Sequence, residues 1–82
     1  MDIKLAATAM RPFVEHAATR CPDHIAGGDA TSISHIRDMI EKIESGEIAD
    51  EKAHRWLGWI QGVTCCYGGA SLDEMKLVNF AA

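Results

Sequence analysis

A row of isoleucines at helical spacing constrains the fold of this chain more than any other feature. Its members are Ile33, Ile36, Ile40 and Ile43. A repeat of three and four residues places them on one face of a helix, with charged side chains opposite. Thr31, Ser32 or Ser34 can cap the first turn, and Gly46 favours the left-handed conformation that ends a helix. We therefore predict an amphipathic helix over residues 32–45.

A second apolar segment follows after a short link. Asp50 can cap a helix that we predict over residues 51–67. Its broad apolar face comprises Ala53, Trp56, Leu57, Ile60, Val63, Thr64 and Tyr67, widened by Trp59 and Cys66. Charged side chains stop after Arg55, so the last three turns require neighbours nearly all round, or a partner. Gly68 and Gly69 end this helix, which we expect to be the central one.

The two ends of the chain are also helical in pattern. Residues 3–20 are rich in alanine, and Pro12 either kinks one helix or opens a second one. Residues 21–29 read as a loop. Ser71 and Glu74 have the spacing of a capping box, which predicts a final helix over residues 72–79. We expect that helix to bury Leu72, Met75 and either Val78 or Phe80.

Size and pattern together predict an all-α fold, a small bundle of four to five helices in a single domain over residues 1–82. A chain of 82 residues supports one modest core. Its hydrophobic fraction of 48% is ordinary for a folded protein. No strand pattern is visible.

Charge and targeting signals narrow the class of protein. The 8 Lys and Arg against 12 Asp and Glu give a net charge of −4, which disfavours direct nucleic-acid binding. The uncharged stretch 56–72 is short and interrupted by glycines, so we expect no membrane contact. We see no signal peptide, and three cysteines do not form the even framework of a secreted scaffold. We expect reduced thiols and a cytoplasmic protein.

Two glycines and two tryptophans stand out in the predicted central helix. Gly58 and Gly62 lie one turn apart, and each destabilises a helix by about 1 kcal/mol relative to alanine. Either another helix of the same chain packs closely there, or a second chain enters the groove. Trp56 and Trp59 point about 60° apart on the helix. One can enter the core while the other lies at its border, where a tryptophan can anchor a partner.

Acidic residues gather around the turn between the two central helices. They are Glu41, Glu44, Glu47, Asp50 and Glu51. One interpretation is a solvated turn with acids favourably placed at a helix start. The other is a negative patch that docks on a basic surface, with rapid and salt-sensitive association. We expect these five acids, together with Trp59, to form the partner-binding residues, and Gly58, Gly62 and Trp56 to serve helix packing or dimerisation.

Metal binding and catalysis have little support in the sequence. Cys21 and His24 have the spacing of zinc ligands, but a second close pair is absent, because Cys65 and Cys66 diverge on a helix. We therefore expect no metal and no cofactor. The chain has no phosphate-binding loop or nucleophile elbow, and His54 after Asp50 reads as a solvated helix pair. We expect that the protein is not an enzyme.

The segment Arg-Trp-Leu-Gly-Trp-Ile-Gln-Gly at residues 55–62 resembles small helical proteins encoded by bacteriophages. Ser34-His35-Ile36 before it, and Gly68-Gly69 and Leu72-Asp73-Glu74-Met75 after it, fit the same pattern. The resemblance covers residues 32–79, and Cys65-Cys66 departs from the aliphatic residues expected there. It implies a phage or prophage origin and a bacterial host cytoplasm.

These observations lead to a functional expectation with one alternative. We expect a protein-binding protein that acts stoichiometrically on a host protein or protein complex. An anti-CRISPR inhibitor is its most concrete version, because small acidic phage proteins often inhibit host defence. The alternative is a homo-oligomeric helical module, with a homodimer through Gly58 and Gly62, that binds a small ligand or a metal through Cys21 and His24.

Overall fold

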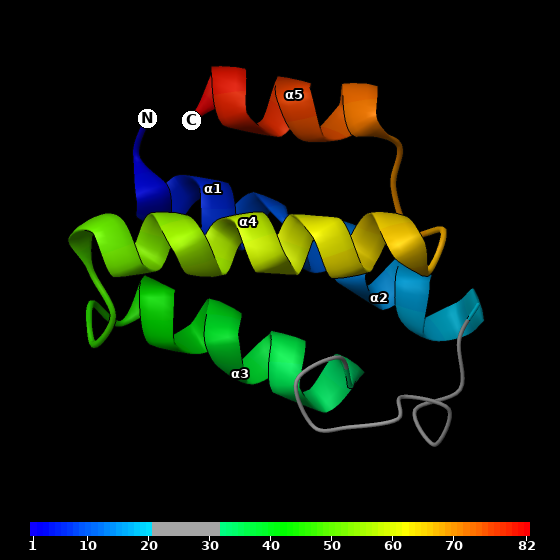
Figure 1. Cartoon of the computed structure of the whole chain (residues 1–82), viewed down its shortest axis with the longest axis horizontal. Helices are drawn as coiled ribbons and strands as arrows, with labels where there is room; N and C mark the ends of the chain where they lie inside the picture. Colours follow the sequence, from blue (N-terminus) through cyan, green and yellow to red (C-terminus); the bar gives the residue numbers. More distant parts are fainter. Residues whose placement is uncertain (21–31) are drawn as a thin grey trace.

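The computed structural model describes residues 1–20 and 32–82, and this part of the chain is helical with no strand (Figure 1). Its helices are α1 (Ile3–Ala9), α2 (Arg11–Arg20), α3 (Ile33–Glu44), α4 (Asp50–Cys66) and α5 (Leu72–Ala81). The predicted all-α bundle is confirmed. None of the described helices is long and apolar enough to cross a membrane.

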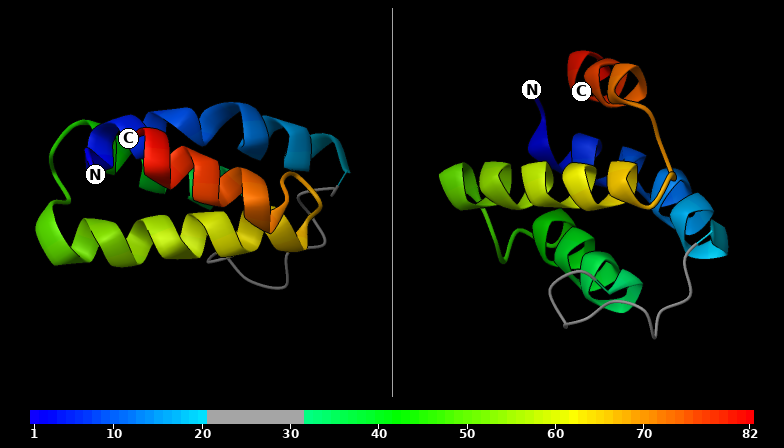
Figure 2. Two further views of the ribbon diagram at one scale, coloured as in Figure 1. Left: turned by 90° about the horizontal axis from the view of Figure 1, so that it is seen from above. Right: turned by 45° about the vertical axis from the view of Figure 1, so that its right-hand side comes forward.

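The longest helix, α4, contacts α1, α2 and α3. In Figure 1 it runs between α3 on one side and α5 on the other, with α1 and α2 behind it. Figure 2 shows that α5 lies over α1 and α4 on the side away from α3. Contacts of α3 and α4 with the α1–α2 pair enclose the core. The expectation of a central helix surrounded by neighbours is not met, because α4 lies along one side of the described bundle and its residues Gly58, Trp59 and Gly62 are exposed (Figure 2).

The isoleucine row of α3 supplies a large share of the core. All four isoleucines are buried, as predicted from their spacing. Met39 of the same helix is also buried, and the other described helices and the α1–α2 junction supply Ala6, Ala7, Met10, Val14, Ala17, Ala53, Leu57, Ile60, Val63 and Met75. Ser32 caps α3, since its hydroxyl oxygen accepts from the amide of His35 at 3.1 Å. Ser34 lies inside the helix and Thr31 lies outside the described residues.

Pro12 opens a second helix rather than kinking a single one. Helix α1 ends at Ala9, Met10 serves as its cap, and Pro12 is the second residue of α2. At this position the missing proline amide removes no helical hydrogen bond. Asp2 caps α1, because its carboxylate accepts from the amides of Lys4 and Leu5 at 3.0 and 3.2 Å.

The start of α4 differs from the prediction. Asp50 is the first helical residue, and Ala49 takes the cap position without a side-chain hydrogen bond. Asp50 has a φ of 55°, a left-handed conformation that aspartate tolerates better than most residues. Its carboxylate lies in the first helical turn, where the helix dipole favours negative charge.

The turn from α4 to α5 depends on two glycines, as the sequence indicated. Gly68 has a φ of 75°, the left-handed conformation that terminates the helix. At Gly69 a Cβ atom would lie 2.5 Å from the carbonyl oxygen of Phe13 and 2.6 Å from Cβ of Ala17. The absent side chain therefore lets the turn lie directly against the backbone of α2.

Helix α5 begins as predicted but buries less than predicted. The capping box is present: the Ser71 hydroxyl accepts from the amide of Glu74, and the Glu74 carboxylate accepts from the amide of Ser71. Met75 alone is buried on this helix. The expectation for Leu72 is wrong, because its side chain is 67% exposed. Val78 is half-buried, whereas Phe80 is 91% exposed.

The exposure of α5 follows from how it is attached. Met75 and Val78 face the bundle, and the amide of Asp2 donates to the carbonyl oxygen of Ala82 at 2.8 Å. The side chains of Gln61 and Asn79 hydrogen-bond to each other across α4 and α5, at 2.7 and 3.3 Å. These contacts hold one edge of α5, so its remaining apolar side chains face outward.

Candidate protein-binding face

The side of α4 that points away from the core carries exposed residues, and no other described helix packs against its glycines. We call this surface, formed by Gly58, Trp59, Gly62, Cys65 and Cys66, the outer face of α4. A Cβ atom built at Gly58 or at Gly62 would meet nothing within 4 Å. Within residues 1–20 and 32–82, no other helix packs closely against these glycines, contrary to the first of the two explanations offered by the sequence. The core lies on the opposite side of the helix.

Shallow apolar hollows flank the two glycines. One has a volume of about 330 Å³ and is lined by Gly58, Trp59, Gly62, Val63, Cys66 and Tyr67. The other has a volume of about 310 Å³ and is lined by Gly58, Gln61, Gly62, Cys65, Leu72 and Met75. The glycines form the floor between the hollows. Leu72, expected in the core, instead forms the wall of the second hollow.

The two tryptophans of α4 lie in different surroundings, as expected from the angle of about 60° between their directions on the helix. Trp56 is half-buried and packs against the core. The ammonium of Lys52 lies 5.6 Å from the centre of its ring, a cation–π distance. Trp59 is 46% exposed and stands at the edge of the glycine floor. Trp59 and Cys66, predicted to widen the buried face of α4, widen the exposed one.

Of the five acidic residues predicted around this turn, one forms hydrogen bonds with neighbouring helices and four are exposed. Glu44 accepts hydrogen bonds from the Thr8 hydroxyl at 2.6 Å and from both Nε and Nη2 of Arg11. The Arg11 hydrogen bond, opposed by partial burial and assisted by Thr8, holds the pKa of Glu44 below its usual value. The same hydrogen bond raises the pKa of Arg11. Glu44 thus links α1 and α2 to α3. The solvent-facing acids of this group are Glu41, Glu47, Asp50 and Glu51.

A second ion pair fixes α2 against α3. Both Nε and Nη2 of Arg37 donate to the two carboxylate oxygens of Glu15, at 2.7 and 2.6 Å. This hydrogen bonding lowers the pKa of Glu15. Sequence reasoning assigned no role to Glu15 or Arg11. Their partners lie 22 and 33 residues away along the chain, so no local charge pattern indicates either pair.

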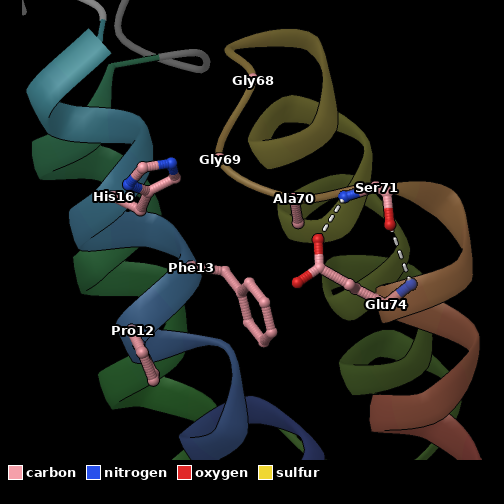
Figure 3. Close-up of a pocket in the computed structure, with 8 residues that line it drawn as sticks. All are labelled: Pro12, Phe13, His16, Gly68, Gly69, Ala70, Ser71 and Glu74. Atoms are coloured by element: carbon pink, nitrogen blue, oxygen red, sulfur yellow. Dashed lines mark hydrogen bonds between the residues drawn. The ribbon is translucent and has the colours of Figure 1, made fainter.

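A cavity between α2 and the turn before α5 contains few groups that could do chemistry. Figure 3 shows this space of about 530 Å³, where His16 and Phe13 of α2 face the turn before α5 and Glu74. One oxygen of the Glu74 carboxylate already accepts from the amide of Ser71. The titratable side chains that line it are His16 and Glu74, and the Ser71 hydroxyl accepts a hydrogen bond from the amide of Glu74 in the capping box.

The structure also places His54 and Cys65 among the titratable residues that the sequence singled out. Nδ1 of His54 donates to the backbone carbonyl of Asp50 at 3.0 Å, not to its carboxylate. Burial raises the pKa of the Cys65 thiol, which disfavours the nucleophilic thiolate. Within residues 1–20 and 32–82, no three His, Cys, Asp or Glu side chains gather to hold a metal ion. The candidate ligands Cys21 and His24 lie outside the described residues.

A further apolar groove of about 520 Å³ runs between α5 and the α1–α2 pair. Its walls include Leu5 and Leu77, which are 58% and 67% exposed, together with Phe13 and Val78. Exposed apolar surface therefore borders α5 on both sides.

Comparison of the chain with protein-family models, with curated proteins and with solved structures found no match. The outer face of α4 is therefore described by its residues and geometry alone. That geometry offers uncharged contact surface with a glycine floor, which suits the close approach of another polypeptide.

Proposed function

We propose that this chain is a protein-binding protein that acts by forming a stoichiometric complex, with the outer face of α4 as its contact surface. The open space at Gly58 and Gly62 carries the proposal. Glycine inside a helix lowers helix stability by about 1 kcal/mol relative to alanine. Nothing in the described part of the chain requires that loss at either position. A second polypeptide packed against the glycine floor would offset it.

The chemistry around the floor supports a polypeptide rather than a charged small molecule. No charged residue occurs from residue 56 to residue 72. Trp59 and Leu72, which stand on opposite sides of the floor, are 46% and 67% exposed. Large apolar side chains around a concave floor are typical of the anchoring centre of a protein interface.

The acids at the amino end of α4 extend this surface with negative charge. Glu51 lies on the exposed side of α4, and Glu47 and Asp50 precede it in the turn. Together with Glu41 they would attract a partner whose neighbouring surface is basic. Such attraction accelerates association and weakens at high salt.

The resemblance to phage proteins supports a bacterial host protein or protein complex as the target. On this proposal the chain blocks its target by occupying a surface, without catalysis and without a cofactor. Inhibition of a host defence system, such as a CRISPR effector complex, is the most concrete version. The bacterial cytoplasm is the compartment in which such a target would be met.

The test is affinity capture from bacterial lysates, one of them containing a CRISPR effector complex, at low and at high salt. We expect one dominant partner in a fixed ratio, lost from the Trp59→Ala variant and retained by the Phe80→Ala variant. Both residues are exposed aromatics, so the second variant is a matched control. Equal capture by both variants would contradict the proposed surface.

The acidic contribution is tested separately with Glu47→Lys and Glu51→Lys in one chain. Glu44 must be left intact, because its replacement would break the Arg11 ion pair that joins the helices. We expect the charge-reversed protein to remain folded and to associate more slowly at low salt. Unchanged association rates would remove the acidic turn from the interface.

A further inference from the structure

Helix α5 is attached to the bundle by a small part of its surface. Met75 is buried on this helix and Val78 is half-buried. Its other large apolar side chains are exposed: Leu72, Leu77 and Phe80. Of the other described helices, α1 contacts α5 most, and Figure 1 shows α5 at the edge of the bundle, on the opposite side of α4 from α3. The apolar area that fixes α5 is therefore small compared with that of α3, which buries its whole isoleucine row.

Hollows lie along both sides of α5. The groove of about 520 Å³ separates it from the α1–α2 pair, with Leu77 and Leu5 among the lining residues. The hollow of about 310 Å³ separates it from α4, with Leu72, Met75 and Cys65 among the lining residues. Side chains beside a hollow lack contact atoms on that side, so dispersion attraction holds α5 less firmly than a fully packed helix.

The polar contacts of α5 with its neighbours lie where water can replace them. The amide of Asp2, an exposed residue, donates to the carbonyl oxygen of Ala82 at 2.8 Å. The side-chain amides of Gln61 and Asn79 hydrogen-bond to each other at a half-buried site. A hydrogen bond that can be exchanged for one to water contributes little net stability. These contacts therefore orient α5 without fixing it strongly.

The turn before α5 determines where movement can occur. Gly69 is buried, and its close approach to the carbonyl oxygen of Phe13 holds the turn against α2. The capping box joins Ser71 and Glu74, which both belong to the start of α5. The cap therefore stays with α5 whether or not the helix contacts the bundle. Ala70, between the anchored glycine and the cap, is the point about which α5 can turn.

The rest of the core does not depend on α5. Met75 is the contribution of α5 to the buried apolar side chains of the described residues, and the others come from α1–α4 and the α1–α2 junction. Separation of α5 from the bundle thus leaves the isoleucine row of α3 and the side chains packed against it in place.

We infer that α5 is a strap that opens as a unit about Ala70 while α1–α4 stay folded. In the closed form it covers apolar surface of α1 and the side of α4 that carries Cys65. In the open form this surface is accessible, so any molecule that binds it must compete with α5. Opening of α5 does not depend on the contact surface proposed above, and either can be rejected while the other stands.

Native-state hydrogen exchange, measured by mass spectrometry on peptides from each helix, tests the strap. A helix of 10 residues is marginally stable by itself in water, so the amides of α5 exchange once it opens. We expect them to be at least about 100-fold less protected than the slowest amides of α3. Equal protection of the two helices would overturn the inference, because α5 would then be released only when the whole chain unfolds.

Two kinds of variant separate local opening from global unfolding. Ile40→Val, in the core of α3, should accelerate exchange of the slowest α3 amides by up to about tenfold and leave α5 exchange unchanged. Met75→Ala should accelerate α5 exchange at least about tenfold, whereas Phe80→Ser, a matched change at an exposed position of α5, should leave it unchanged. Acceleration of α5 by Ile40→Val to the same extent as α3 would contradict independent opening.

Alkylation of Cys65 by iodoacetamide measures the same opening from beneath the strap. Burial raises the pKa of this thiol, so opening increases both its accessibility and its thiolate fraction. In a Cys66→Ser background, we expect Met75→Ala to make Cys65 react several-fold faster and Phe80→Ser to leave its rate unchanged. Peptide mapping distinguishes Cys65 from Cys21. Equal Cys65 rates with and without Met75→Ala would show that α5 does not control access to this side of α4.

Discussion

Two pairs of glycines on and after α4 share a residue type and differ completely in surroundings. Gly68 and Gly69 end the helix, and a Cβ at Gly69 would collide with the backbone of Phe13 and with Ala17. Gly58 and Gly62 lie inside the same helix, and a Cβ at either would meet nothing within 4 Å. The first pair is required by the fold of this chain. The second pair meets no such requirement from the residues that the structure describes.

The largest loss of stability is expected for the Gly69→Ala variant. The atoms that a methyl group would meet belong mainly to the backbone of α2, so either α2 or the turn must shift. We expect a loss of about 2–3 kcal/mol in the free energy of unfolding, as in other overpacked sites. Urea denaturation followed by circular dichroism measures it. A stability equal to that of the parent would show that the turn does not depend on close approach.

The Gly68→Ala variant tests the left-handed backbone conformation of Gly68 separately from the close contact that Gly69 makes with α2. Gly68 has a φ of 75°, and the neighbouring Nε of Arg20, at 3.0 Å from the added Cβ, belongs to a long side chain that can move. The expected loss is therefore that of a left-handed alanine, about 1–2 kcal/mol. A loss larger than that of Gly69→Ala in the same denaturation assay would reverse the assigned roles of the two glycines.

The acidic turn offers the same contrast between residues used by the fold and residues left at the surface. Glu44→Gln removes the charge that Arg11 binds, whereas Glu47→Gln changes an exposed side chain. Because the pair is partly solvent-exposed, we expect Glu44→Gln to lose about 0.5–1 kcal/mol and Glu47→Gln almost nothing. Equal unfolding midpoints for the two variants in urea would contradict the distinction.

The contribution of Glu44 should also depend on pH with a defined sign. Its pKa in the folded protein is lowered from the ordinary value of 4.5, so the unfolded chain takes up a proton at higher pH than the folded chain does. The stabilisation is therefore complete above 4.5 and is lost as pH falls through the lowered pKa. The difference between parent and Glu44→Gln should shrink over that range. A difference that persists in strong acid would rule out this ion pair as its source.

The smallest effect is expected at exposed positions of α5. Phe80→Ser should change stability by less than about 0.5 kcal/mol, because Phe80 is 91% exposed. Met75→Ala on the same helix removes a buried side chain and should lose about 2 kcal/mol or more. Thermal unfolding of the two variants checks the pair. Similar losses would mean that α5 packs more extensively than its edge contacts indicate.

Sequence periodicity predicted the helices well because the apolar spacing is local. The isoleucines of α3, the capping box of α5 and the stop at Gly68–Gly69 follow from patterns a few residues long. The same reasoning failed for Asp50, which enters the helix instead of capping it. Pro12 shows the limit of local reasoning. The same residues around Pro12 would be compatible with a kinked helix or with the start of a new helix. Only the packing of α1 and α2 on α3 distinguishes the two.

The candidate site was harder to predict because burial is a property of the whole molecule. Leu72 and Trp59 have the residue types of a core, but both are exposed, Leu72 because α5 contacts the bundle along one edge. The Arg11–Glu44 link joins residues far apart in sequence, so Glu44 looked like the other acids of the turn. Gly58 and Gly62 were conspicuous in the sequence, but only their surroundings decide between an internal and an external role.

The central claim is that the described part of the chain does not require glycine at positions 58 and 62. The most direct test is the free energy of unfolding of the variant carrying both Gly58→Ala and Gly62→Ala, measured in urea on dilute protein. We predict an increase of about 1–2 kcal/mol, since alanine favours the helix and the added methyl groups meet open space. A decrease in stability would show that the fold itself requires these glycines, and would contradict the account.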